Sequence, residues 1–321
     1  MARTVIAIDL TGNTPALLLG KSSFGKIKYT QLQLDDITKD KKLIPRSLIV
    51  SFIPCNYSFT RWLHVPFKNW RKVIKVLPSL LDVELPFSID DTVYSFPAFK
   101  HSGRSTQVLA AGALKKDIVA ILEKFAEYHL KPDIIDHQGL ALWSQSIKEL
   151  PPEQIGNSVL RILIYLANNA SAIVIGQGND FISAHALNQQ NPSEIRRIVN
   201  STLSSVPENT TQKVPSATSL HDKLQSRVVW VWCGETILDK HKLSALQHVM
   251  NTIKEGEHIL HDNPKEFLLR GLISRALTSE KNMCDLSLDA ESKLLRRTRI
   301  LSLCSAGSLL LSGLLLIATG F

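Results

Sequence analysis

The last stretch of the chain, from Ile300 to Phe321, most constrains what this sequence can fold into. It contains no charged residue, and its polar side chains are serines and one threonine. A helix over this stretch would be roughly 33 Å long at about 1.5 Å per residue, enough to cross the hydrocarbon core of a bilayer. The alternative is a buried C-terminal helix of a soluble protein, but the stretch exceeds the usual length of a core helix. The sequence therefore predicts a transmembrane helix over 300–321.

A basic cluster stands directly before this helix and consists of Lys293, Arg296, Arg297 and Arg299. The positive-inside rule keeps such a cluster in the cytoplasm. The chain opens with a short strand pattern and lacks the apolar core of a signal peptide there. We therefore expect an inner-membrane protein that spans the membrane once and keeps everything before the span in the cytoplasm.

The net charge of +8 does not indicate nucleic acid, because four of the positive charges lie in the basic cluster and the rest are scattered. A surface that favours anionic lipid is the simpler interpretation. The four cysteines show no CxxC spacing, which favours reduced structural thiols in a cytosolic domain. The ten histidines form no zinc-binding pattern, so we expect no metal site.

Two sets of three short strands, each joined by tight turns, open the two halves of the chain. The polar, proline-bearing segment 151–158 is the best boundary between the halves. Later in each half, apolar runs alternate with amphipathic helical patterns, and the pattern over 68–84 contains Pro78, which should kink or interrupt a helix. The predicted elements are strands at 5–10, 15–19, 26–34, 48–53, 60–65, 92–96, 106–113, 131–136, 159–166, 171–176, 180–187 and 228–233, and helices at 68–84, 116–129, 139–147, 193–204, 238–254 and 264–278.

This organisation resembles the actin-like ATPase fold, an α/β, ribonuclease H-like fold of two related halves. Residues 60–66 (TRWLHVP), a helix and residues 83–96 (VELPFSIDDTVYSF) look like the segment by which PilM-type pilus proteins enter their small subdomain. Residues 108–113 (VLAAGA) and 130–142 (LKPDIIDHQGLAL) are similar to the next strand, helix and strand of that family. The resemblance implies a first half with a small inserted subdomain over 1–155, a second half over 156–282, a juxtamembrane segment over 283–299 and the membrane helix.

A cytoplasmic actin-like domain followed by one span is also the order found in GspL of type II secretion. GspL-like proteins normally carry a periplasmic ferredoxin-like domain after the span, so that domain is either missing here or absent from a truncated sequence. The stretch over 284–299 is similar to the membrane-proximal peptide and basic stretch of PilN. On this resemblance, Leu286 and Leu288 would contact the chain's own actin-like domain, while ordinary linker packing is the alternative.

Actin-like ATPases hold phosphates on glycine-bearing hairpin turns, and an aspartate from each half manages Mg²⁺ and water. The first turn here keeps Asp9, followed by Gly12, Asn13 and Thr14, although Asp9 could equally cap the turn. The third, adenosine-side turn keeps only one glycine, Gly234, and Glu235 follows it.

The second turn departs from the family pattern, with Tyr165 and Ala167 where the family has aspartate and glycine. A phenol does not bind Mg²⁺ as a carboxylate does, and a β-carbon obstructs a phosphate. We therefore predict no catalytic residues and no ATP hydrolysis. No cofactor is expected, and weak binding of ATP with Mg²⁺ at a vestigial site is left open.

The resemblance favours a scaffold that recruits a GspE-like assembly ATPase to the membrane platform of a type II secretion machine. Its other partners would be GspM-like or PilN/PilO-like membrane proteins, and a homodimer is left open. The alternative is a PilM-type pilus assembly protein that binds or hydrolyses ATP. A membrane-tethered sugar-kinase relative and an FtsA-like filament protein are further rivals, but the latter usually ends in an amphipathic surface helix.

Overall fold

The computed structural model describes residues 4–23, 25–39, 43–151, 153, 156–188, 191–205, 227–238, 240–253, 255–261, 264–278 and 284–289. Residues 1–286 form one compact unit, and residues 287–321 form a second. The predicted membrane helix and the basic cluster before it lie outside the described residues. No helix within the described ranges is both long and apolar enough to span a bilayer.

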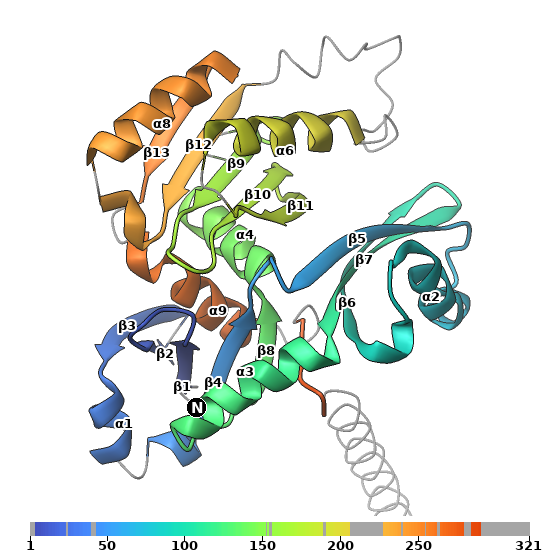
Figure 1. Ribbon diagram of the computed structural model, residues 1–321. Helices are drawn as coiled ribbons and strands as arrows, with labels where there is room; N and C mark the ends of the chain where they lie inside the picture. Colours follow the sequence, from blue (N-terminus) through green and yellow to red (C-terminus); the bar gives the residue numbers. More distant parts are fainter. Residues whose placement is uncertain are drawn as a thin grey trace, which may run out of the picture. The chain divides into compact units, whose positions relative to one another are not determined.

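Two five-stranded sheets with the same topology form the centre of the first unit (Figure 1). The first sheet has the order β3-β2-β1-β4-β8, with β1 Thr4–Asp9, β2 Ala16–Ser23, β3 Lys26–Leu32, β4 Ser47–Ile53 and β8 Ile134–His137. The second has the order β11-β10-β9-β12-β13, with β9 Leu160–Tyr165, β10 Ala172–Gln177, β11 Asp180–Ala186, β12 Val228–Cys233 and β13 Gly256–Leu260. In each sheet three antiparallel strands continue into parallel strands, so the two halves are related.

The central strands are apolar throughout because both faces of each sheet are covered. Side chains of β1 alternate between two cores: Val5 and Ala7 face the core between the sheets, whereas Ile6 and Ile8 face an outer core. The second half repeats this alternation. Val231 of β12 lies in the inner core, whereas its neighbours in the same strand face an outer core of their own.

The helices cover the sheets in layers. The outer face of the first sheet carries Ile37 of α1 (Leu34–Lys39) and Phe125 of α3 (Lys115–Glu127). The outer face of the second sheet carries α6 (Pro192–Ser205) and α8 (Lys240–Ile253), which contribute Ile195 and Met250 to its core. Figure 1 shows these two helices on the same side of the second sheet.

Two helices exchange between the halves. The helix α4 (Gln138–Glu149) contacts strands of the second sheet, although it precedes them in the chain. The helix α9 (Phe267–Thr278) follows the second sheet, yet it packs on β1, β2 and β4 of the first. A β-carbon on Gly20 of β2 would lie 2.2 Å from Ile273 of α9, so the glycine permits this approach. The two helices also pack against each other and bind the halves into one body.

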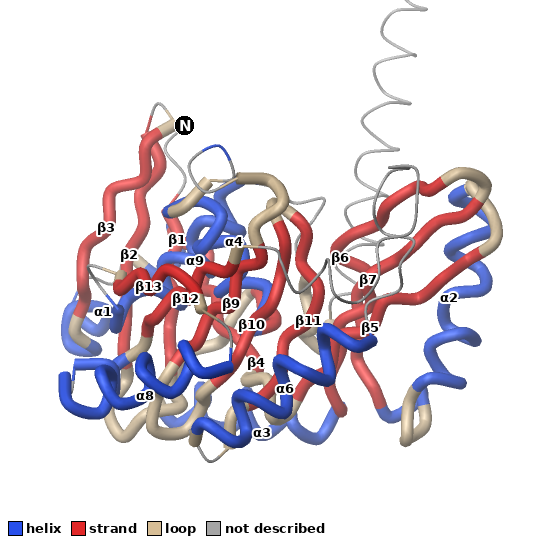
Figure 2. The backbone as a smooth tube through the Cα atoms, turned by 90° about the horizontal axis from the view of Figure 1, so that it is seen from above, coloured by secondary structure: helices blue, strands red, loops and turns tan. Residues whose placement is uncertain are grey.

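A small subdomain is inserted in the first half. Its sheet has the order β5-β7-β6, with β5 Ser58–Val65, β6 Thr92–Ser102 and β7 Ser105–Leu114. One face of that sheet is covered by α2 (Trp70–Glu84) through Val73, Leu77 and Leu81. Figure 2 shows α2 on the outer side of the small sheet. The helix continues through Pro78 rather than stopping there, so the proline does not interrupt it.

Short 3₁₀ turns complete the framework, namely η1 Ile44–Arg46, η2 Ile89–Asp91, η4 Glu235–Leu238 and η5 Pro264–Glu266. Among the described strands and α-helices, β13 and α1 were not predicted from the sequence. The strand β13 has a weak apolar pattern, and its pairing with β12 along the sheet edge fixes it as a strand. The helix α1 is only six residues long, too short for its sequence periodicity to identify it.

Candidate functional site

The candidate site lies where three turns meet between the halves. The first turn joins β1 to β2, the second joins β9 to β10, and the third follows β12 at Gly234. In this arrangement, backbone N–H groups of the turns could close on an anion such as a phosphate, provided that they are free. The hydrogen bonds of each turn therefore decide what the site can do.

In the first turn, Asp9 caps the backbone. One of its carboxylate oxygens accepts hydrogen bonds from the Thr11 N–H and from the Thr11 hydroxyl, both at 2.7 Å. Burial raises the pKa of Asp9, and the two bonds from Thr11 oppose that shift. Gly12, Asn13 and Thr14 follow on the exposed side of the turn. The geometry matches the capping interpretation of Asp9, one of the two that its sequence position allowed.

The second turn satisfies its own backbone. The hydroxyl of Ser171 accepts a bond from the Ala167 N–H at 2.9 Å and donates one to the Ala167 carbonyl at 2.6 Å. The N–H of Leu166 is bonded to the Cys233 carbonyl at 2.9 Å. The Tyr165 side chain is buried in the core between the sheets, and burial raises its pKa well above the ordinary value. These N–H groups are therefore already engaged.

The third turn supplies an anion of its own. An oxygen of the Glu235 carboxylate lies 3.2 Å from the Asn168 N–H, the next donor of the second turn. Gly234 brings the two turns together: its φ is +109°, and a β-carbon there would lie 2.1 Å from the Leu166 carbonyl oxygen. A carboxylate thus occupies the kind of position that a phosphate oxygen would need.

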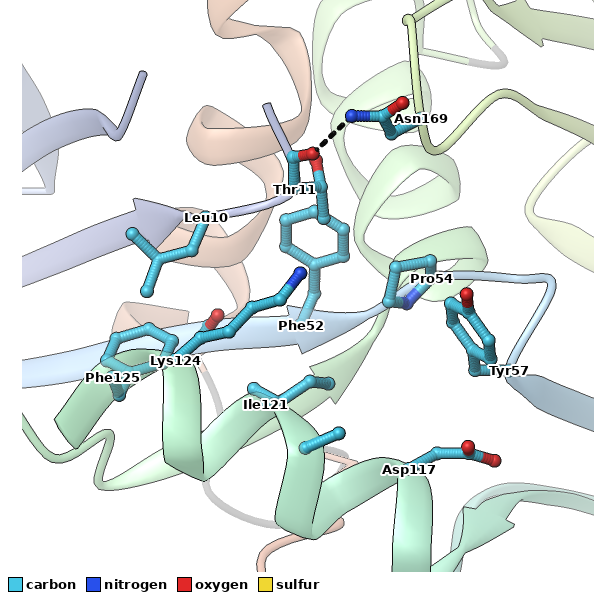
Figure 3. Close-up of a pocket in the computed structure, with 12 residues that line it drawn as sticks. Leu10, Thr11, Phe52, Pro54, Tyr57, Asp117, Ile121, Lys124, Phe125 and Asn169 are labelled. Atoms are coloured by element: carbon cyan, nitrogen blue, oxygen red, sulfur yellow. Dashed lines mark hydrogen bonds between the residues drawn. The ribbon is translucent and has the colours of Figure 1, made fainter. Parts of the chain in front are cut away.

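Two further side chains tie the halves together next to the turns. Gln138, the first residue of α4, is fully buried. Its Oε1 accepts from the Cys55 N–H at 2.9 Å, and its Nε2 donates to the Ala170 carbonyl at 2.7 Å. The amide of Asn169 donates to the Thr11 carbonyl at 2.7 Å, as the dashed line in Figure 3 shows. The second turn is thereby held against the first half.

A cavity of about 470 Å³ opens beside these turns (Figure 3). Phe52, Ile121 and Phe125 contribute to its apolar lining, and the Lys124 side chain extends into it. Asp117 and Lys124 are the charged residues in its lining, and both come from α3. A triphosphate with Mg²⁺ would need more positive charge and converging carboxylates. The lining suits an apolar or aromatic group better. Within the described parts of the chain, no cluster of metal-ligating side chains is found.

The structure separates the two leucines of the predicted partner peptide. Leu286 is fully buried in the core between the sheets, and its N–H donates to the Ile135 carbonyl of β8 at 2.8 Å. Residue 286 therefore lies beside the edge strand of the first sheet. Leu288 belongs to the second unit, and its side chain is 46% exposed.

A buried ion pair lies on the same edge strand. The carboxylate of Asp136 accepts from Nε of Arg275 at 2.5 Å. Burial disfavours the charged guanidinium, but the attraction of Asp136 outweighs it, so the pKa of Arg275 is raised. Three cysteines lie in the described part of the chain; all are buried and unpaired, and burial raises the pKa of the Cys55 thiol to about 12.

Sequence reasoning missed Gln138 and Ser171 as members of the site. The sequence indicated both residues only weakly. Gln138 stands at the start of a helix after a buried strand, and Ser171 follows Ala167 by four residues. Glu235 was recognised as a negative charge near the third turn. Its contact with the second turn depends on the pairing of β12 beside β9, which places the ends of these strands together.

Comparisons with known proteins support the fold. No family model matches the sequence, and no curated protein matches it. A chain of the PilM–PilN type IV pilus biogenesis complex aligns with a TM-score of 0.55 at 13% identity, covering 86% of this chain and 99% of that one. The cytoplasmic domain of EpsL, an inner-membrane component of the Vibrio cholerae type II secretion system, aligns with a TM-score of 0.46 at 12% identity, covering 86% and 96%.

A protein of unknown function with an actin-like ATPase fold from Bacteroides thetaiotaomicron aligns with a TM-score of 0.47 at 10% identity, covering 85% of this chain and 96% of that one. The alignment with the PilM–PilN chain, together with the two related five-stranded sheets, shows that the chain has the actin-like ATPase fold, and the resemblance to PilM-type proteins is confirmed at the level of the fold. At these identities the likeness shows no activity.

Proposed function

We propose that this protein is a non-catalytic scaffold of a type II secretion machine, which recruits the assembly ATPase to the inner membrane. One observation carries the proposal: in an actin-like fold, the protein's own Glu235 and Ser171 engage the turn that would hold phosphates. The fold is shared with a chain of the PilM–PilN type IV pilus biogenesis complex. An actin-like fold whose second turn is already bonded to the protein's own side chains favours a binding role over hydrolysis.

The membrane part of the proposal rests on the sequence. The uncharged stretch 300–321 and the cations at 293, 296, 297 and 299 would place the actin-like unit on the cytoplasmic side. The proposed partners are a GspE-like ATPase and GspM-like or PilN/PilO-like membrane proteins, and the protein could also form a homodimer. Binding energy would come from surface patches and exposed sheet edges.

Calorimetry of the full chain with ATP and Mg²⁺, followed by a phosphate-release assay, tests the non-catalytic part. We expect neither binding nor turnover. Micromolar binding with turnover that is lost in an Asp9→Asn variant would contradict the proposal and favour the PilM-type alternative, in which the protein binds or hydrolyses ATP.

Vesicle flotation tests the scaffold part. The full chain is reconstituted into vesicles, and the soluble assembly ATPase from the same cell is added. We expect the ATPase to float with vesicles that carry the protein and to remain in the soluble fraction with empty vesicles. Equal distribution in both samples would contradict the recruiting role without touching the nucleotide result.

A further inference from the structure

An exposed aromatic face stands on the small subdomain, away from the turns described above. It consists of Phe67 shortly before α2, Trp70 and Ile74 in the first part of α2, and Phe99 on the edge strand β6. Each of these side chains is more than a third exposed, from 38% for Phe67 to 49% for Phe99. The rings of Trp70 and Phe99 lie 4.9 Å apart, centroid to centroid, so they form one surface. Large apolar side chains gathered in this way mark an interaction site.

Three exposed cations border this aromatic face: Lys68, Arg71 and Lys75. A fourth, Lys72, lies on the opposite side of the helix from Trp70 and Ile74. Among the residues that the structure describes, no carboxylate pairs with any of the four. The sequence contains no acidic residue between Arg61 and Leu81. Asp180 of β11 approaches the neighbouring strand β6, but it pairs with Lys100 at 2.7 Å. The border of the face is therefore uniformly positive.

These cations oppose the local electrostatics of the fold. The first turn of α2 contains no acidic residue, and Arg71 and Lys72 occupy it. The N-terminus of a helix carries partial positive charge and normally favours acidic side chains in its first turn. Cations at the N-terminus of a helix lower its stability when no acidic side chain of the protein pairs with them, and such a cost is typical of a functional surface. An external anion would relieve the repulsion.

The three sides of α2 have different characters. Val73, Leu77 and Leu81 are buried against the small sheet. Trp70 and Ile74, four residues apart, lie on an adjoining flank, and the cations cover the remaining side. Aromatic rings next to lysine and arginine are typical of a surface that binds at a membrane–water interface. There the aliphatic parts of the lysine and arginine side chains lie along apolar surface, and their charged ends contact the lipid headgroups.

We propose that this aromatic–basic face of α2 docks on an anionic lipid bilayer. The lipid headgroups would neutralise Lys68, Arg71 and Lys75, and Trp70 and Phe99 would enter the interfacial layer. Residues 287–299 could extend over at most roughly 45 Å, so a chain anchored at 300–321 would hold the face at a high local concentration beside the bilayer. Only this tethering step rests on the proposed function. The charge and exposure of the face do not.

Tryptophan quenching tests the proposal because Trp70 is the most exposed of the five tryptophans. The full chain is reconstituted into vesicles of phosphatidylcholine, with or without phosphatidylglycerol, whose acyl chains are either brominated or not. The emission of the wild type minus that of Trp70→Phe isolates Trp70. We expect most of the Trp70 emission to be lost in brominated anionic vesicles, and retained in neutral vesicles and at high salt.

A charge-reversal pair provides the matched control. The triple variant Lys68→Glu, Arg71→Glu and Lys75→Glu should lose the quenching. The triple variant Lys21→Glu, Lys26→Glu and Lys28→Glu reverses three exposed cations on the β2–β3 hairpin and should keep it. Equal loss in both triple variants would show a general charge effect and would overturn the assignment of this face.

Flotation separates this proposal from the membrane span. A chain that floats but shows no quenching of Trp70 in anionic vesicles overturns the docking proposal and leaves the span standing. A chain that floats only with anionic vesicles contradicts the span and supports docking. If Trp70 becomes shielded only when the assembly ATPase is added, the face binds an acidic protein surface and the lipid proposal is wrong.

Discussion

The first and second hairpin turns occupy equivalent places in the two halves, but their backbones are satisfied differently. In the first turn one carboxylate, Asp9, bonds Thr11, and the residues that follow are exposed. In the second turn Ser171 and Glu235 engage successive N–H groups. The first turn is thus capped locally, whereas the second is closed by Ser171 at its own end and by Glu235 of the third turn.

The difference shows how an actin-like fold can be retained when its phosphate cradle is not available. A free cradle needs N–H groups that stay unpaired until an anion arrives, and buried unpaired N–H groups cost free energy. Once a carboxylate and a hydroxyl occupy the donors, the turn is stable without ligand. We therefore expect substitutions in the second and third turns to affect folding more than substitutions in the first.

The largest expected effect is that of Gly234→Ala. The new β-carbon would meet the Leu166 carbonyl oxygen at 2.1 Å, and the backbone φ of +109° is strained for any other residue. We expect a loss of about 3 kcal/mol or more in the free energy of unfolding, measured by denaturant titration.

The first turn provides the control. At Gly12 a new β-carbon would find its nearest neighbour at 3.5 Å, an ordinary contact. Gly12→Ala should change stability by less than about 1 kcal/mol. Similar losses at both glycines would show that the two turns are equally constrained and would contradict the comparison.

Next in size is Gln138→Ala, which removes one of the two side-chain ties between the halves. The Cys55 N–H and the Ala170 carbonyl would be left unpaired in a buried place. We expect a loss of about 2–3 kcal/mol, read from the midpoint of denaturant unfolding. Gln177→Ala removes a bond to the Ser158 carbonyl within the second half, and a change within about 0.5 kcal/mol is expected there. An equal effect of the two would argue against a special role for Gln138.

The pH dependence of stability tests His137, the residue that caps the N-terminus of α4. Nδ1 of His137 accepts from the Gly139 N–H at 3.1 Å, which requires the neutral ring. Burial, assisted by the charge of Arg275, lowers the pKa of His137 from 6.5 to about 3. Between these values the unfolded state binds more protons, so stability is complete above pH 6.5 and falls as the pH decreases.

The slope from this one histidine should reach about 1.4 kcal/mol per pH unit. Other groups titrate in the same range, so the informative quantity is the difference between the wild type and His137→Asn, since asparagine can still cap the helix. Unfolding measured at several pH values should show a shallower slope for the variant. An unchanged slope would mean that His137 does not titrate in this way.

The smallest expected effects come from the caps of the two turns. Ser171→Ala removes both hydrogen bonds between the Ser171 hydroxyl and the backbone of Ala167 and should cost about 1–2 kcal/mol, whereas Asp9→Ala removes a cap in the more exposed turn and should cost about 1 kcal/mol. Both are measured by thermal or denaturant unfolding. A larger loss at Asp9 than at Ser171 would reverse the proposed order of the turns.

Strand and helix patterns predicted most of the fold because the period of apolar residues reports burial. The runs at 5–10 and 228–233 predicted central strands, and these strands are buried on both faces. The edge strand β13 was missed, since its five residues carry little apolar pattern of their own. The exchange of α4 and α9 was also not predicted, because periodicity reports that a helix has an apolar face but not which sheet that face meets.

At the site, the sequence by itself determined which residue types stand at the three turns: Asp9 in the first, Tyr165 and Ala167 in the second, and Gly234 with Glu235 in the third. Only the tertiary structure decided what these residues contact. Gln138 bonds Cys55 and Ala170, and Glu235 reaches Asn168, across separations of 32 to 83 residues. Such contacts follow from the pairing of strands and the exchange of helices. Local propensity carries no information about them, because hydrogen-bond partners distant in the chain are set by how the sheets assemble.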